Sequence, residues 1–225
     1  MKLYRLVTLI GLIGLPQILF ANALTEDIDP QMSYVFYLHG YIVEGDDPTP
    51  KHSRWGVYDF PAIKTALMSS EYQLTAEHRP KNTDPFDYAQ TLADKVNKLS
   101  ENGVPAYNIS IIGFSRGGLI TAITSSKLAN KDINFAILAA CTSGLANNPD
   151  IMLHGHILSI YETTDSVGSC DEATSRNPET IASYKEISIS TGKEHGAFYQ
   201  PIAQWVLPVK RWLLKEKREK HITTQ

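Results

Sequence analysis

The chain has 225 residues and a formal net charge of −3 at pH 7, and 43% of its residues are hydrophobic. Its mild acidity argues against a nucleic-acid partner, because binding nucleic acid requires a basic face. No internal repeat, low-complexity tract or long linker interrupts the sequence, which favours one domain over several.

The first residues have the pattern of a secretory signal peptide. Lys2 and Arg5 precede the apolar run Leu6–Phe20, and the small-residue cleavage pattern Ala21–Ala23 follows it. The run is shorter than the roughly 20 residues of a membrane-spanning helix. We therefore expect a signal peptide at 1–23, a single mature domain at 24–225 without stable membrane insertion, and export to the periplasm or the medium.

Strand-like and helix-like patterns alternate along the mature chain. The expected strands lie at 34–40, 72–80, 109–112, 135–141, 157–162 and 186–190. The expected helices lie at 59–70, at 83–103, directly after Ser115, and at 202–214. Asp59 and Asp84 are the expected N-caps of the first two helices. This alternation predicts a mostly parallel sheet with helices on both faces, where reactive groups gather beyond the carboxyl ends of the strands.

Ser115 stands at the junction between a predicted strand and the next helix, within the pattern Gly113-Phe-Ser-Arg-Gly. Gly-x-Ser-x-Gly at such a junction is typical of a nucleophile elbow, where a strained turn exposes the serine hydroxyl. The alternative is a serine that only caps the helix. Because a bare match arises by chance in about one chain of this length in fifteen, the interpretation also requires a base and an acid.

His195 is the predicted general base. It follows the strand at 186–190, precedes the last helix and has glycine neighbours. His39 ends the first mature strand, and we expect it to shape the turn there. His154 and His156 form a His-x-His pair without a suitably spaced third ligand, so no metal site is predicted.

Asp165 is the predicted acid, because it lies a few residues beyond a strand and in the loop before His195. Glu162 and Asp171 are alternatives: Glu162 is nearer the strand end, and Asp171 lies further out. A purely turn-forming Asp165 is also compatible with its Thr-Asp-Ser context. The chain order Ser115, Asp165, His195 is the order expected of a correctly interpreted elbow serine.

Four motifs carry a resemblance to a known family: LHGY at 38–41, GFSRGG at 113–118, YETTD at 161–165 and KEHGAF at 193–198. On these motifs the whole mature chain resembles a small bacterial α/β-hydrolase of the dienelactone-hydrolase and carboxylesterase groups. The resemblance implies an α/β-hydrolase fold of about six strands. The expected mature chain begins at what resembles the family's third strand, so we expect the first two strands to be absent, and only a short loop stands where lipases insert a lid.

The resemblance implies a serine-hydrolase mechanism. Ser115 attacks an acyl carbonyl, His195 takes its proton, and Asp165 orients the imidazole. The backbone N–H groups of Tyr41 and Arg116 form the oxyanion hole. No metal or organic cofactor is implied. The expected substrates are small carboxylic esters; thioesters, lactones, peptides and a catalytically silent binding module stay open as alternatives.

The loop after the first mature strand carries the candidate substrate-binding residues Glu44 and Trp55, and Arg79 follows the next strand. Arg79 or Arg116 is suited to holding an anionic substrate group, or to pairing with Glu44 or Glu77. Solvated loop charges and core packing are equally compatible with this region. Since no lid or large apolar insertion is visible, short-chain or small polar esters are favoured over long lipids.

Cys141 closes one predicted strand, and Cys170 lies a few residues beyond Asp165. The resemblance implies that the strands preceding them are neighbours, which places both cysteines at the same end of the sheet. Their Cα atoms can then approach within the roughly 4.4–6.8 Å that a disulfide needs. We expect them to pair after export; the alternative is two separate thiols, with Cys141 acting as a small buried hydrophobe.

Overall fold

A computed structural model gives the structure of residues 28–223, with side chains described through residue 214. The expected signal peptide at 1–23 lies outside the described residues. Among the helices of residues 28–223, none combines the length and the hydropathy that a membrane span requires.

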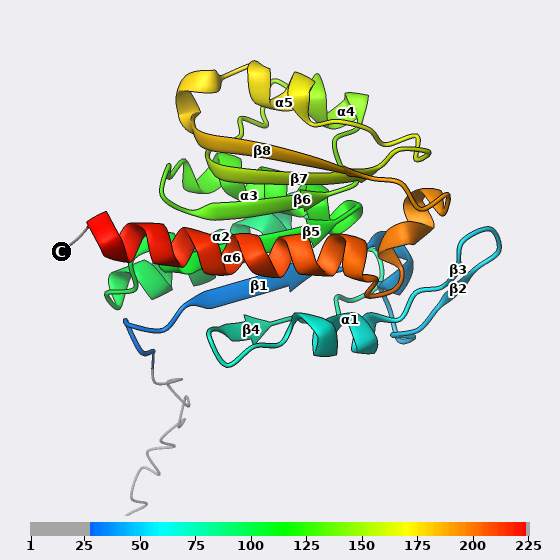
Figure 1. Ribbon diagram of the computed structural model, residues 1–225, viewed down its shortest axis with the longest axis horizontal. Helices are drawn as coiled ribbons and strands as arrows, with labels where there is room; N and C mark the ends of the chain where they lie inside the picture. The colour runs from blue at the N-terminus through cyan, green and yellow to red at the C-terminus, as the bar shows by residue number, and fades with distance from the viewer. Residues whose placement is uncertain (1–27, 224–225) are drawn as a thin grey trace, which may run out of the picture.

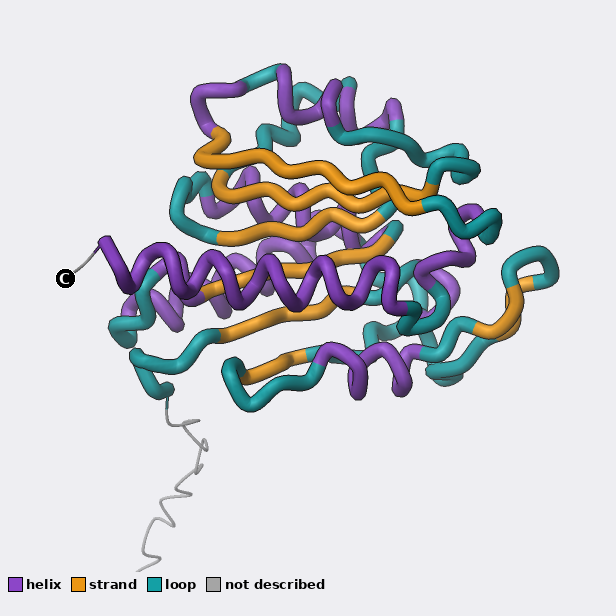
Figure 2. Tube along the Cα trace, viewed as in Figure 1, coloured by secondary structure: helices purple, strands orange, loops and turns teal. Residues whose placement is uncertain are grey.

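The centre of the molecule is a six-stranded sheet in the order β4-β1-β5-β6-β7-β8, and every neighbouring pair is parallel. Figure 2 shows these strands stacked edge to edge between helical layers. The six strands are β1 (Tyr34–Leu38), β4 (Gln73–Thr75), β5 (Ile109–Phe114), β6 (Asn134–Leu138), β7 (Gly155–Glu162) and β8 (Ile181–Ile189). The predicted parallel sheet of about six strands is confirmed.

The two edge strands differ from their predicted lengths. β4 stops at Thr75, because the backbone of Arg79 turns aside to donate to a ring nitrogen of His39 and to accept from Gly45. β8 begins earlier than predicted, since it pairs with β7 along its whole length. Its residues are exposed or half-buried except for the buried Ile189, and Lys185 stands exposed near its middle.

Helices cover both faces of the sheet, as predicted. In Figure 1, α6 crosses the near face and α1 lies below it, whereas α2 and α3 lie behind the sheet. The helices are α1 (Phe60–Leu67), α2 (Pro85–Glu101), α3 (Arg116–Leu128), α4 (Ser143–Ala146), α5 (Asp171–Ser175) and α6 (Ala203–Thr223). The predicted N-caps are confirmed: the carboxylate of Asp59 accepts from the first turn of α1, and that of Asp84 from the first turn of α2.

The alternation of side chains along β1 explains the two layers. Phe36 and Leu38 belong to the core that β1 forms with α2 and α3, whereas Val35 and Tyr37 belong to the core shared with α1 and α6. Successive side chains of a strand point to opposite faces, so both faces must be apolar. The strand is therefore buried at all five positions.

A disulfide joins Cys141 and Cys170, whose Cα atoms lie 5.1 Å apart. Cys141 follows β6 and Cys170 precedes α5, at the carboxyl end of the sheet. The structure thus contains the expected pair, and it links the end of β6 to the segment beyond β7.

Candidate active site

Ser115 lies in a strained turn between β5 and α3. Its φ of 54° and ψ of −116° fall in a region that residues with a side chain rarely adopt. The flanking glycines permit this turn, because a Cβ on Gly113 would overlap the carbonyl of Gly117, and one on Gly117 would overlap the carbonyl of Leu38. The Ser115 side chain makes no capping hydrogen bond to α3, which disfavours the capping alternative.

Ser115, His195 and Asp165 form a continuous hydrogen-bonded chain. His195 lies in a 3₁₀ turn after β8 (Glu194–Phe198), and its Nε2 is 2.8 Å from the Ser115 Oγ. Its Nδ1 is 2.6 Å from the Asp165 Oδ2. Because the ionised carboxylate only accepts, Nδ1 carries the proton and Nε2 is left to accept from the serine hydroxyl. The Phe114 ring packs 4.8 Å from the imidazole and restricts its position.

The two alternative acids are engaged elsewhere. The Asp171 carboxylate accepts from the Tyr184 hydroxyl at 3.0 Å. Glu162, the last residue of β7, is fully buried. Burial opposes its ionisation, but hydrogen bonds from Thr164 and from the backbone N–H groups of Thr191 and Gly192 outweigh that effect and lower the pKa of Glu162 to about 2. Neither alternative is bonded to His195.

The two predicted oxyanion donors begin short helical segments. Arg116 is the first residue of α3, and Tyr41 is the first residue of a 3₁₀ turn (Tyr41–Val43) after His39 and Gly40. The first N–H groups of a helix have no acceptor within it. The N–H groups of Tyr41 and Arg116 therefore have no acceptor within their own helical segments.

His39 holds the loop that carries Tyr41. Its Nδ1 lies 2.8 Å from the Gly40 carbonyl oxygen, so Nδ1 donates, and its Nε2 accepts from the Arg79 N–H at 2.9 Å. Burial and then the nearby Arg79 guanidinium lower the pKa of His39 to about 3. The ring is thus neutral at pH 7 and shapes the turn, in agreement with the sequence expectation.

Glu44, Arg79 and Arg116 form an ion cluster beside this loop, with Glu44 and Arg79 buried and Arg116 partly exposed. The Glu44 Oε1 is 3.5 Å from the Arg79 Nε and 3.2 Å from the Arg116 Nε. The Glu44 and Arg79 side chains are only 1% and 0% exposed, so they do not line a solvent-accessible surface. Glu44 and Arg79 thus pair with each other, as in the alternative to substrate binding that the sequence left open. The Arg116 guanidinium also lies over the Tyr41 ring, 5.1 Å from its centre.

Trp55 belongs to a hairpin, β2 (Lys51–His52) and β3 (Gly56–Val57), that projects from the sheet at the right of Figure 1. Its ring lies 5.2 Å from that of His195, and its Nε1 donates to the Glu194 carboxylate at 3.1 Å. Arg54 pairs with the same carboxylate at 2.6 Å. The hairpin is thus fastened to the loop that carries the histidine.

Sequence reasoning missed the roles of Glu194 and Glu162. Glu194 lies 139 residues from Trp55, and no local pattern signals that contact. The sequence pattern suggests Glu162 only as an alternative acid. The available signal is a charged residue at the end of a mainly apolar strand, because a charge at a buried position requires partners.

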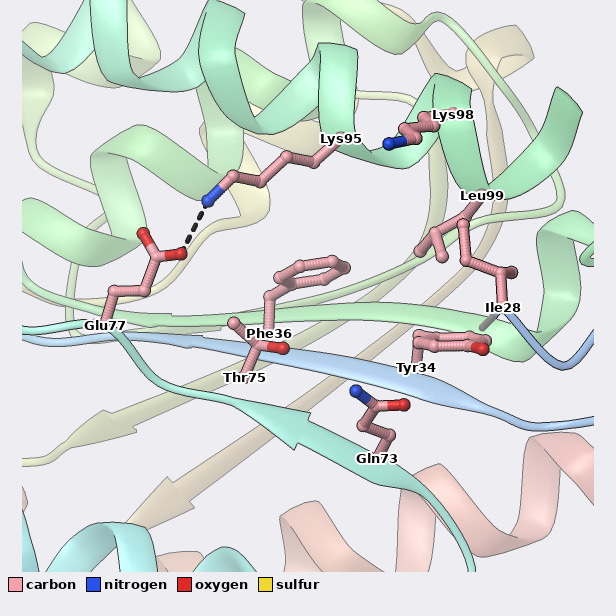
Figure 3. Close-up of a pocket in the computed structure, with 9 residues that line it drawn as sticks. All are labelled: Ile28, Tyr34, Phe36, Gln73, Thr75, Glu77, Lys95, Lys98 and Leu99. Carbon is pink, nitrogen blue, oxygen red and sulfur yellow. Dashed lines mark hydrogen bonds and ion pairs between the residues drawn. The ribbon is translucent and has the colours of Figure 1, made fainter. Parts of the chain in front are cut away.

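A cavity of about 330 Å³ lies apart from these residues, between α2 and the β4–β1 edge (Figure 3). Phe36, Tyr34 and Thr75 line it from the strands, and Lys95 pairs with Glu77 at its rim. None of the residues that line it belongs to the group of Ser115, His195 and Asp165.

The described residues contain no cluster of three or more metal-ligating side chains. The imidazoles of His154 and His156 bond instead to the Met152 carbonyl and the Ser183 hydroxyl.

No family model and no curated relative matches the chain. Solved structures do. SOBER1 of Arabidopsis thaliana superposes with a TM-score of 0.52 and 14% identity, over 82% of this chain and 99% of that one. Est1E from Butyrivibrio proteoclasticus superposes with a TM-score of 0.55 and 12% sequence identity, over 86% of this chain and 91% of that one. Esterase PE8 superposes with a TM-score of 0.52 and 16% sequence identity, over 81% of this chain and 92% of that one. At such low sequence identity, the similarity shows a shared fold alone.

Proposed function

We propose that this chain, which has the α/β-hydrolase fold, is a serine hydrolase that cleaves small carboxylic esters through an acyl-enzyme on Ser115. The observation that carries the proposal is the hydrogen-bonded chain from Ser115 through His195 to Asp165, at the carboxyl end of the sheet. A strained elbow with an adjacent base and an orienting acid is the arrangement that activates a serine hydroxyl.

The reaction proceeds in two steps. His195 Nε2 takes the proton as the Ser115 Oγ attacks the acyl carbonyl, and the resulting imidazolium then gives that proton to the leaving alcohol. Water attacks the acyl-enzyme in the second step, with His195 again as the base. Asp165 holds the Nδ1–H tautomer and stabilises the imidazolium throughout. The proposed steps require no metal or organic cofactor.

The backbone N–H groups of Tyr41 and Arg116 hold the oxyanion of the tetrahedral intermediate. Loss of one such donor costs about 3–4 kcal/mol of transition-state stabilisation. The ion cluster around Glu44 and the cation–π contact of Arg116 with Tyr41 support this role, because they hold the two donor-bearing segments next to each other.

Small esters are the proposed substrates because the described residues contain no large insertion after β6. The connection from β6 to β7 carries only the four-residue helix α4, where a lid would otherwise be inserted. The neighbour PE8 is described as an esterase, which fits this proposal. We expect acetyl and butyryl p-nitrophenyl esters to be hydrolysed faster than the palmitoyl ester, and the reverse order would contradict the proposed substrate class.

The proposed site of action is the periplasm or the medium, after removal of residues 1–23 from a single domain at 24–225. The Cys141–Cys170 disulfide supports it, because such bonds persist in oxidising compartments. N-terminal sequencing of protein recovered from cell fractions tests the cleavage site, with Leu24 as the expected first residue.

A fluorophosphonate probe tests the enzymatic proposal. It should label Ser115 of the wild type and fail to label Ser115→Ala or His195→Ala. Ser115→Ala should also lower kcat by about 10⁴- to 10⁶-fold, while thermal unfolding stays unchanged. Folded wild-type protein that neither reacts with the probe nor hydrolyses p-nitrophenyl acetate would point to the binding-module alternative.

A further inference from the structure

Glu162 joins two loops that the proposed mechanism needs. One carboxylate oxygen accepts from the Thr164 N–H at 2.6 Å and from the Thr164 hydroxyl at 2.5 Å. The other accepts from the Thr191 N–H at 2.7 Å, the Gly192 N–H at 2.9 Å and the Thr191 hydroxyl at 3.2 Å. Thr164 immediately precedes Asp165 in the chain. A single carboxylate thus bridges the acid loop and the loop that leads to His195.

The position of Glu162 makes this bridge rigid. It ends β7, where its backbone is still paired with Ile189 of β8, and its side chain is completely buried. Its carbonyl oxygen also accepts from the Asp165 N–H at 3.0 Å. The sheet therefore fixes the carboxylate, and the carboxylate fixes both loops.

We propose that Glu162 is the positioning residue that holds Asp165 and His195 within hydrogen-bond distance of each other. It has no contact with His195 or Ser115 among its hydrogen bonds, so it acts through the two loops rather than on the reacting atoms. This inference rests on the proposed function, which assigns Asp165 and His195 their roles. It replaces the view of Glu162 as a competing acid.

Only an ionised carboxylate satisfies these donors. In Glu162→Gln the amide has one accepting oxygen and one NH₂ group. Whichever way the amide is turned, its NH₂ faces the backbone N–H of Thr164 or those of Thr191 and Gly192. One loop is therefore released while the volume of the side chain is kept.

The test compares wild type, Glu162→Gln and the matched control Glu186→Gln. Glu186 is also a bonded glutamate of this region, and it accepts from the Cys170 N–H at 2.8 Å without contacting the histidine loop. With p-nitrophenyl acetate as the probe substrate, Glu162→Gln should lower kcat by about 10- to 100-fold and leave KM within about twofold of wild type. Glu186→Gln should keep kcat within about threefold of wild type.

A second readout needs no turnover. The Nδ1 proton shared by His195 and Asp165 should give a downfield ¹H NMR resonance in the wild type, which weakens or disappears in Glu162→Gln and persists in Glu186→Gln. If Glu162→Gln does not fold, the same comparison is made with Glu162→Asp, whose shorter side chain reaches only one of the two loops.

The outcomes separate the two proposals. An unchanged downfield resonance and unchanged kcat in folded Glu162→Gln would overturn the positioning role, as would equal losses of kcat in both variants. If the wild type shows the resonance but neither reacts with fluorophosphonate nor turns over ester, the proposed function fails, and the resonance alone decides the role of Glu162.

Discussion

Replacing Cys141 and Cys170 together by serine removes the covalent link between the end of β6 and the segment beyond β7. The disulfide joins residues 29 apart in the sequence. For a closed loop of that size, the chain-entropy model gives a stabilisation of roughly 3–4 kcal/mol at 25 °C. In a domain of about 200 residues, 1 kcal/mol shifts Tm by about 2–4 °C, so the double variant should unfold about 6–16 °C below wild type.

Thermal unfolding followed by circular dichroism at pH 7 measures this difference. Both cysteines are buried, so serine also introduces a buried hydroxyl at each site. The double alanine variant and wild type in reductant provide the controls. The double serine variant and both controls should have a Tm well below that of oxidised wild type. If both double variants unfold within about 2 °C of oxidised wild type, the reasoning is refuted.

The same variant tests a functional consequence. Cys170 lies five residues beyond Asp165, so its attachment to β6 limits the movement of the acid loop. We expect a lower kcat with little change in KM at a temperature where the variant is folded. Full activity of the double variant would show that the disulfide does not position Asp165 and serves only to stabilise the fold.

Three further changes have outcomes that follow from the structure. Gly117→Ala should prevent folding or abolish labelling of Ser115, because the added Cβ overlaps a carbonyl at the end of β1; soluble yield and probe labelling measure this. Glu44→Ala should lower the free energy of unfolding in urea by about 3–5 kcal/mol, since it leaves the Arg79 guanidinium buried without its counterion, whereas the exposed control Glu101→Ala should change little. The depressed pKa of Glu162 stabilises the fold above the pKa of an unfolded glutamate, and this stabilisation is lost as pH falls toward about 2. Urea unfolding between pH 6 and pH 3 should therefore show a smaller acid loss in Glu162→Gln than in wild type.

The sequence predicted those features that depend on local pattern. Ser115 was recognisable because its glycines and the change of periodicity lie within a few residues of it. Asp165 and His195 followed from their places beyond strand ends, since parallel strands bring such loops to one edge of the sheet. Distance from the strand end favoured Asp165 over Glu162 and Asp171, whereas the chain order Ser115, Asp165, His195 supported the interpretation of Ser115 as an elbow serine.

Features that depend on which strands become neighbours were not predictable in the same way. The ion cluster joins Glu44 to Arg79 and Arg116, which come from three separate segments of the chain. The sequence allowed substrate binding and internal pairing equally for these residues. The burial of Glu44 and Arg79 in the folded chain distinguishes internal pairing from substrate binding. The limited length of β4 has the same origin, since it depends on hydrogen bonds between the Arg79 backbone and the loop after β1.

The two edges of the sheet bear on whether another chain can add a strand to it. An edge strand exposes unpaired N–H and C=O groups on which another chain can add a strand. On one side β4 offers only three residues, too few for a stable intermolecular ladder. On the other side the longer β8 carries the exposed Lys185 near its middle, where an added strand would have to accommodate its charge. Strand addition is thus discouraged at both edges, by brevity at one and by charge at the other.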